Sequence, residues 1–251
     1  MNSTLALLAN NTITDGRHVP YTSRYVALIY PDASIVIANN ILFASSTATD
    51  ALGCGNSITV PANFYNNNVF SSSANGEAYL GCADQTGTNG NISAAPEFVE
   101  TSNFRLKGGS PAIDAGSNAA PHLLKTDLAG NPRIINGNGG PTAIVDIGAY
   151  EFVPVVVSPK SLSFGTRALG SSTSKMLKLT NAQNRALNIS LFSAPTNYSD
   201  TGCAASVPAF TSCTLTVMFQ PVTAGTFKRN LAVTDDAGSS PQTVPLSGIG
   251  R

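Results

Sequence analysis

Three segments in the first half of the chain repeat one pattern of apolar and polar residues. Each has apolar residues first, then a pair or triplet of Asn, then a β-branched or aromatic run. The segments are LLANNTITDG (7–16), IVIANNILFASS (35–46) and FYNNNVFSSS (64–73). Asn11, Asn40 and Asn68 follow one another at spacings of 29 and 28 residues, and a fixed period of this length is typical of solenoids.

The period predicts a short right-handed parallel β-helix over residues 1–100. The alternating apolar residues of IVIANNILF fit strands with one face inside. Asn at the bends would adopt a backbone conformation near the left-handed region, and stacked Asn side chains would hydrogen-bond from coil to coil. GNISAAPEFVE (90–100) is the predicted last coil. The alternative is that Asn-rich β sequence repeats by chance.

The four cysteines form two plausible pairs. Cys54 and Cys82 are 28 residues apart, the same period, so they would be stacked neighbours at a distance that a disulfide accepts. The alternative is two free thiols. Cys203 and Cys213 bracket the loop AASVPAFTS, and they lack the CxxC or His partners of a zinc site. Two pairs with no thiol left over suit an oxidising compartment.

Residues 101–152 consist of turns rich in Gly and Pro, interrupted by single acids. A solenoid needs a cap, and apolar residues of this segment are expected to cover the last coil. The acids are Asp114, Asp127, Asp146 and Glu151. We expect them to accept backbone N–H bonds in turns, or to pair with Arg133 through Asp127 or Asp146. Calcium binding by these four acids is the weaker alternative.

Residues 153–251 alternate between short apolar strands and turns. The strands are predicted at 162–164, 176–181, 187–192, 213–219, 226–235 and 243–250. In CTLTVMF the alternation puts Cys213, Leu215, Val217 and Phe219 on one face, and in LNISLF it puts Leu187, Ile189 and Leu191 on one face. This spacing predicts an immunoglobulin-like sandwich. The predicted fold class is therefore all-β.

The segments NFRLKGGSPAIDAG, TDLAGNPR and VDIGAYE resemble the choice-of-anchor Q domain. The residues that carry the resemblance are Phe104, Leu106, Ser110, Pro111, Ala112, Ile113, Asp114, Gly116, Asp127, Gly130, Arg133 and 146–151. The resemblance implies that residues 101–152 follow a right-handed β-helix in a secreted or surface-attached bacterial protein. It implies no catalytic activity.

Residues 155–250 are similar to the abnormal-spindle/hydin (ASH) type of immunoglobulin-like domain and to its bacterial relative, the choice-of-anchor D domain. The residues that carry this similarity are Leu162, Phe164, Gly165, Leu179, Thr180, Asn181, Cys203, Cys213, Phe219, Pro221, Gly225, Leu246, Gly248 and Gly250. Eukaryotic members are linked to cilia and centrosomes. The paired cysteines and the preceding repeats favour the bacterial, extracytoplasmic branch.

The charge of the chain is balanced overall but uneven along its length. Residues 1–152 carry a net charge of −5 and residues 153–251 a net charge of +5. No cluster of Lys and Arg interleaves with aromatic residues, which argues against a nucleic-acid partner. No apolar run approaches the roughly 20 residues that span a bilayer. Residues 1–9 lack the basic start of a secretory signal, so we expect a fragment of a longer extracellular or cell-surface protein.

Candidate catalytic residues are few. Asp50 and Glu77 lie 27 residues apart, so stacked coils would bring them to the spacing of a hydrolase pair, but loop positions are favoured for both. Arg17, His18 and Arg24 form a basic group that a polysaccharide lyase would need, and solvated loop positions are favoured here too. We therefore expect no catalytic residue and no cofactor.

These patterns predict a non-catalytic, C-terminal part of a bacterial secreted or cell-surface β-helix protein. Its role would be structural, in adhesion or binding, or in sorting, with a polysaccharide or a surface protein as partner. Self-association through the exposed N-terminal coil is also expected. The alternative functions are the tail of a carbohydrate-active β-helix enzyme with its catalytic coils upstream, and an intracellular ASH-like scaffold.

Overall fold

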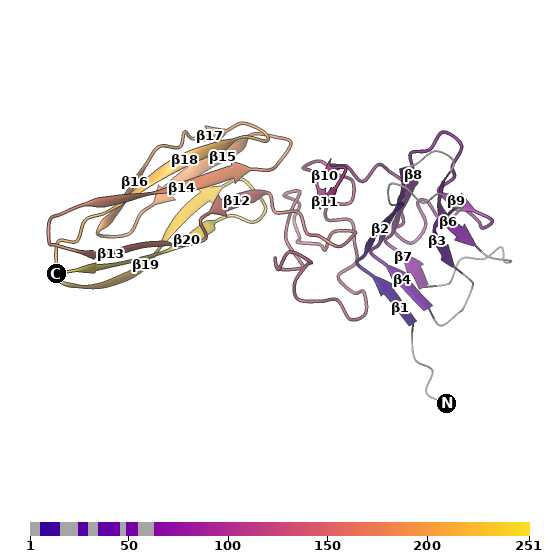
Figure 1. The fold of residues 1–251 in the computed structure, drawn as a ribbon, viewed down its shortest axis with the longest axis horizontal. Coiled ribbons are helices and arrows are strands. Elements are labelled where there is room, and N and C mark those ends of the chain that lie inside the picture. Colours follow the sequence, from indigo (N-terminus) through magenta and orange to yellow (C-terminus); the bar gives the residue numbers. More distant parts are fainter. Residues whose placement is uncertain (1–5, 16–24, 30–34, 46–48, 55–62) are drawn as a thin grey trace, which may run out of the picture. The chain divides into compact units, whose positions relative to one another are not determined.

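The computed structural model describes residues 6–15, 25–29, 35–45, 49–54 and 63–251. The chain is divided into two compact units, which Figure 1 shows as ribbons. Unit 1 comprises residues 1–136 and 141–152, and unit 2 comprises residues 137–140 and 153–251. The secondary structure of the described residues is entirely β. The described part of the chain contains no helix that is long and apolar enough to cross a membrane.

Unit 1 begins with three repeats of three strands each. Repeat 1 contains β1 (Ala6–Ala9), β2 (Thr12–Thr14) and β3 (Tyr25–Ile29). Repeat 2 contains β4 (Ile35–Ala38), β5 (Ile41–Ala44) and β6 (Asp50–Cys54). Repeat 3 contains β7 (Asn63–Tyr65), β8 (Asn68–Ser71) and β9 (Tyr79–Leu80). A hairpin of β10 (Phe98–Glu100) and β11 (Asn103–Leu106) follows.

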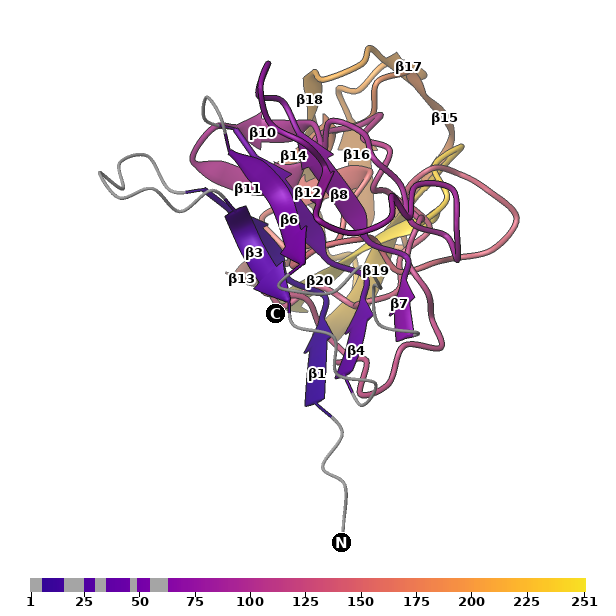
Figure 2. The ribbon, with the colours of Figure 1, turned by 90° about the vertical axis from the view of Figure 1, so that its right-hand side faces the viewer.

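Corresponding strands of the repeats pair in parallel and form three stacks, β1-β4-β7, β2-β5-β8 and β3-β6-β9. Figure 2 shows the first of these stacks with its strands side by side. Leu8, Ile37 and Phe64 occupy equivalent positions in the first stack. Ile37 and Phe64 are fully buried, together with Leu42, Leu52 and Val69. Apolar side chains of one repeat thus stack on apolar side chains of the next, as the alternation in the sequence predicts.

A row of Asn side chains connects the repeats at the bend between the first two stacks. The backbone N–H and the side-chain Nδ2 of Asn40 both donate to Oδ1 of Asn67, each at 3.0 Å. Asn11 donates to Asn40, and Asn67 to Asn91, in the same way. The predicted coil-to-coil hydrogen bonds are therefore present. The third member of the row is Asn67, however, and not Asn68, which pairs with Ile41.

The segment after the repeats packs along their side and not only against the last of them. Gly148 donates its backbone N–H to the carbonyl of Asn39 in repeat 2, at 2.8 Å. Ala149 donates to Oγ1 of Thr12 in repeat 1, at 3.1 Å. Ala120 packs against Val36 and Ala38 of repeat 2. The sequence predicted that this segment covers the last coil, but these contacts place it along repeats 1 and 2. The physical reason is that the outward side chains of β4 are apolar and need cover.

Unit 2 consists of nine strands in residues 153–251, all of which the structure describes. They are β12 (Val155–Ser158), β13 (Leu162–Arg167), β14 (Thr173–Asn181), β15 (Leu187–Ser193), β16 (Tyr198–Thr201), β17 (Ser206–Val207), β18 (Ser212–Phe219), β19 (Gly225–Asp235) and β20 (Gln242–Gly250). One sheet has the order β12-β14-β18-β16 and the other the order β13-β20-β19-β15-β17. Their inner faces share a single apolar core. This is the immunoglobulin-like arrangement that the sequence predicts.

The predicted inner faces of unit 2 are correct except at one position. Leu215, Val217 and Phe219 of β18 are fully buried, and Leu187 and Ile189 of β15 are buried as well. Leu191 is 55% exposed, contrary to the prediction. The pairing of β15 with β19 shifts register between Ile189 and Leu191. A β-bulge of this kind changes the face on which the following side chain lies.

Candidate functional site

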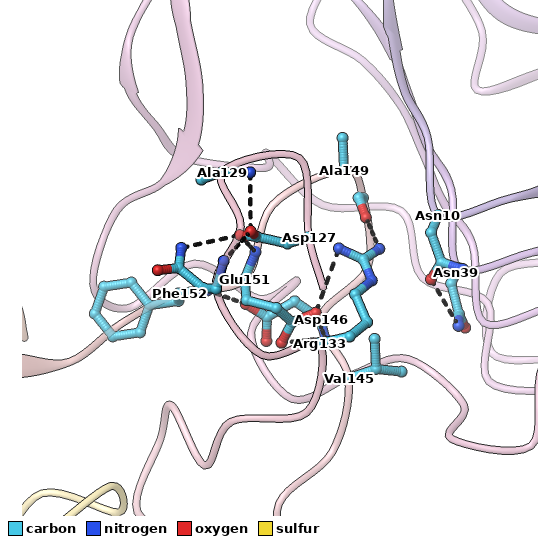
Figure 3. A network of polar contacts seen from close by, with 12 residues as sticks. Asn10, Asn39, Asp127, Ala129, Arg133, Val145, Asp146, Ala149, Glu151 and Phe152 are labelled. Carbon is cyan, nitrogen blue, oxygen red and sulfur yellow. Dashed lines mark hydrogen bonds and ion pairs between the residues drawn. The ribbon is translucent and has the colours of Figure 1, made fainter. Parts of the chain in front are cut away.

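Three of the four predicted acids of residues 101–152 gather around Arg133. Asp127, Asp146 and Glu151 are all buried, and so is the arginine. Figure 3 shows these side chains from close by. We call Asp127, Arg133, Asp146 and Glu151 the acid cluster.

The ion pair of the acid cluster joins Arg133 and Glu151. Arg133 Nη1 lies 3.5 Å from Glu151 Oε1, and the two side chains are 3% and 0% exposed. Arg133 Nη2 also donates to the carbonyl of Gly148. Burial lowers the pKa of Arg133, and the neighbouring carboxylates oppose this shift. The sequence predicts a pair with Asp127 or Asp146, whereas the direct pair is with Glu151.

Asp127 organises a tight turn. Its Oδ1 accepts the backbone N–H groups of Ala129 at 2.9 Å and Asn131 at 2.8 Å. Its Oδ2 accepts the backbone N–H of Glu151 at 2.9 Å and the side-chain amide of Asn131 at 3.1 Å. Burial acts to raise the pKa of Asp127, but these hydrogen bonds outweigh it, and the net shift is downward. Asp127 is therefore an ionised turn residue.

Asp146 links two segments of the chain. Its Oδ1 accepts the backbone N–H of Asp114 at 2.7 Å, and its Oδ2 accepts that of Phe152 at 2.5 Å. The backbone N–H of Asp146 in turn donates to Glu151 Oε1 at 3.1 Å. Burial raises the pKa of both Asp146 and Glu151. The carboxylate of Asp146 raises the pKa of Glu151 further, and the positive charge of Arg133 opposes both shifts. Because both pKa values are raised, the acid cluster tends to keep a proton on Glu151 or Asp146 at neutral pH, next to the positive charge of Arg133.

The acid cluster ties residue 114, the turn at 127–133 and residues 146–152 to one another. Arg133 already places a positive charge among the carboxylates, where a bound cation would otherwise have to supply it. Within the part of the chain that the structure describes, no group of three or more His, Cys, Asp or Glu is arranged to hold a metal ion. Calcium binding by Asp114, Asp127, Asp146 and Glu151 stays an untested prediction.

A second row of Asn side chains, which was not predicted from the sequence, fastens residues 115–117 to the repeats. Asn39 exchanges two hydrogen bonds with the backbone of Ser117, at 2.8 and 3.1 Å. Asn66 donates to the carbonyl of Ala115 at 3.0 Å. Both Asn residues have positive φ, 56° and 50°. A side chain on Gly116 would come within 2.6 Å of the Val145 carbonyl. The consecutive Asn residues of each repeat are the sequence feature from which this second row could have been predicted.

The other candidate catalytic residues have structural contacts or lie outside the described residues. Asp50 is buried, and its Oδ1 accepts the backbone N–H of Glu77 at 2.7 Å, while Glu77 is exposed. This contact stabilises the packing of repeat 2 on repeat 3. Arg17, His18 and Arg24 lie outside the described residues, so nothing is concluded about them.

Both predicted disulfides are confirmed. Cys54 and Cys82 are joined with a Cα–Cα distance of 5.6 Å, so the bridge connects repeats 2 and 3. Cys203 and Cys213 are joined with a Cα–Cα distance of 5.4 Å at the start of β18. All four cysteines of the chain are thus paired.

Residues 154–243 match the model of the ASH family, described as abnormal spindle-like microcephaly-associated, ASPM-SPD-2-Hydin. Unit 2 therefore contains an ASH domain. The buried side chain of Asn181, one of the residues that carry the resemblance, donates to the carbonyls of Arg185, Val207 and Pro208. No curated protein matches the chain.

Among solved structures, a protein of unknown function from Porphyromonas gingivalis W83 matches at a TM-score of 0.35 and 10% identity, over 38% of this chain and 46% of its own. The ASH/PapD-like domain 7 of human CEP192 matches at 0.34 and 14%, over 39% of this chain and 85% of its own. The VesB protease of Vibrio cholerae matches at 0.34 and 15%, over 49% and 43%. Likenesses this distant support no conclusion about activity.

Proposed function

We propose that this chain is a non-catalytic, C-terminal part of a bacterial secreted or cell-surface β-helix protein, with a structural, binding or sorting role. One observation carries the proposal. The buried acids of unit 1 bond to the chain itself, through backbone N–H groups and Arg133. A catalytic pair needs carboxylates that face a substrate. Asp50, the buried candidate, accepts a backbone N–H as well.

We further propose that the three repeats are coils of a right-handed parallel β-helix. The parallel stacks, the burial of like side chains and the Asn row support this. We assign residues 101–152 to the choice-of-anchor Q type of cap. The contacts between Asp114 and Asp146 and between Arg133 and Glu151 support this, because each joins two of the motifs that carry the resemblance.

The extracellular location rests on the cysteines. Two disulfides that use every cysteine of the chain are typical of an oxidising compartment. The proposal includes self-association through repeat 1. Among the described strands, β1, β2 and β3 each pair on one side only, with β4, β5 and β6. Unpaired strand edges are templates for another chain.

The proposal is tested by assaying the purified chain for release of reducing ends and of unsaturated products from a panel of acidic polysaccharides. We expect no turnover. Turnover that is lost in Asp50→Asn or Glu77→Gln would contradict the proposal and favour the enzyme alternative. For the location, cysteines that react with a thiol reagent in protein isolated from its native host would favour the intracellular scaffold instead.

A further inference from the structure

The two ends of the stacked repeats differ in how they are covered. Beyond repeat 3, Val69 donates its backbone N–H to the carbonyl of Ile92, and Asn66 donates to that of Asn89, each at 3.0 Å. At repeat 1, the strands β1, β2 and β3 each have a partner on one side only, among the strands that the structure describes. Figure 2 shows β1 at the edge of its stack. Three strand edges of a single repeat are therefore templates for further pairing.

The apolar interior is also incompletely covered at repeat 1. Leu8 and Ile13 hold the positions that Ile37 and Leu42 hold in repeat 2. Ile37 and Leu42 are 0% and 1% exposed. Leu8 and Ile13 pack against the same core but are only partly buried. A further layer of apolar side chains on repeat 1 would remove this remaining apolar surface from water, which is favourable.

The Asn row has a direction, and repeat 1 lies at its accepting end. In each step the Asn of one repeat donates its backbone N–H and its Nδ2 to Oδ1 of the next Asn along the chain. Asn11 directs these donors at Asn40, and no described residue donates to Oδ1 of Asn11. At the other end, Asn91 directs its Nδ2 at the carbonyls of Phe64 and Thr88. The row thus ends within the chain after repeat 3 but can be continued before repeat 1.

We propose that repeat 1 is the docking face of a further Asn-bearing repeat, which precedes it in the same polypeptide and stacks on it in parallel. This inference rests on the proposed place of the chain at the C-terminal end of a β-helix protein, and it states what repeat 1 contacts there. The Asn of the added repeat donates to Oδ1 of Asn11. Its strands pair with β1, β2 and β3, and its apolar side chains cover Leu8 and Ile13.

A second copy of this chain fits the same face less well. The open edges of a second copy are again those of repeat 1, because residues 89–92 bond to the far side of repeat 3. A two-fold axis would then bring Oδ1 of Asn11 in one copy toward the same atom of the other, and two acceptors form no hydrogen bond. A single extended peptide would pair with only one of the three edges. Self-association is therefore the weaker use of this face, and a preceding repeat would exclude it.

The test lengthens the full chain by one repeat, through a second copy of residues 6–34 inserted before Ala6. This insert has the length of the 29-residue period between Asn11 and Asn40. Hydrogen exchange and sedimentation equilibrium compare the chains with and without it. We expect the amides of β1, β2 and β3 to exchange about tenfold more slowly or better with the insert, and concentration-dependent association to disappear. Asn11→Ala in the inserted copy should reduce this protection by about fivefold.

The matched control is an insert of the same residues in scrambled order, which should leave the exchange of β1, β2 and β3 unchanged. The inference is overturned if the ordered insert gives no protection while β14 and β18 keep their native exchange. Equal protection by the ordered and scrambled inserts, or by Asn and Ala in the copy, would also overturn it. So would a dimer of the unmodified chain in which β1 is as well protected as β4, because a second copy would then be the occupant. None of these results bears on turnover, so the proposed absence of catalysis is judged separately.

Discussion

The two units bury different chemistry. Unit 2 is held by an apolar core in which Phe219, Leu215 and Leu177 are fully buried, and its buried polar side chains are Asn181 and Gln183. The described part of unit 1 buries many more polar side chains, including the Asn row and the acid cluster. A buried polar group stabilises a fold only when its partners are present. Unit 1 should therefore be sensitive to the loss of single hydrogen-bonding groups, and unit 2 to the loss of volume.

The largest expected effect comes from breaking the buried ion pair. Arg133→Met removes the buried cation that faces Asp127, Asp146 and Glu151 and its hydrogen bond to the Gly148 carbonyl, and it should lower the stability of unit 1 by about 3–5 kcal/mol. The matched control is Arg185→Met, which breaks an exposed pair with Asp236 and should cost less than about 1 kcal/mol. Denaturant unfolding, with hydrogen exchange to separate the units, measures both. Equal costs would remove the contrast between buried and exposed pairs.

The corresponding change in unit 2 is a cavity. Phe219 packs against Phe164, Tyr198 and Phe227, with ring centroids 4.9–5.8 Å apart. Phe219→Ala should lower the stability of unit 2 by about 3–5 kcal/mol. Hydrogen exchange in β18 and β14 should rise, while the amides of the acid cluster stay protected. If exchange also rose around Glu151, the two units would not be energetically separate.

A smaller effect is expected in the Asn row, and it should depend on position. Asn67→Ala removes an amide that bonds to repeat 2 on one side and to Asn91 on the other, and each buried group left without a partner costs about 1–3 kcal/mol. Asn11→Ala should cost less, because Asn11 is only partly buried and lies at the end of the row. Thermal unfolding compares the two variants. An equal loss would mean that the row does not act through burial.

Unit 2 and the Asn row also show which features could be predicted from the sequence and which could not. Alternation predicted six of the nine strands of unit 2 and most of their inner faces, because a period of two is visible in a single strand, but the short strands β16 and β17 were missed. It failed at Leu191, because a bulge leaves no clear mark in the sequence. In repeat 3 the sequence predicted Asn68 as the member of the Asn row, one residue after the correct Asn67. Residues 66–68 are all Asn, so only the strand register distinguishes them.

The acid cluster was predicted in its members but not in its pairing. Four acids near turns were identified as turn or ion-pair residues, and Asp127 and Asp146 do accept backbone N–H groups. The partner of Arg133 depends on how two turns meet in space, and neither spacing nor composition contains that information. The side-on packing of residues 112–149 was missed for the same reason.

The pH dependence of stability is expected to be a modest effect with a definite sign. Burial raises the pKa of Glu151 to about 9, above its value in the unfolded chain. The resulting contribution is complete below the unfolded pKa and is lost as the pH rises through the folded pKa. The stability of unit 1 should therefore fall as the pH rises from about 4.5, the ordinary pKa of this carboxyl, through about 9. Glu151→Gln should reduce this fall, as measured by denaturant unfolding at each pH. A fall of the same size in the variant would assign the pH dependence to other groups.

The central claim is that the carboxylates of the acid cluster are satisfied by the chain itself. The most direct test is thermal unfolding of unit 1 in millimolar calcium and in a chelator, since an ion that binds only the folded state raises its stability. We predict the same unfolding temperature in both. An increase with calcium that disappears in Asp127→Asn would contradict the claim and make the cluster a metal site.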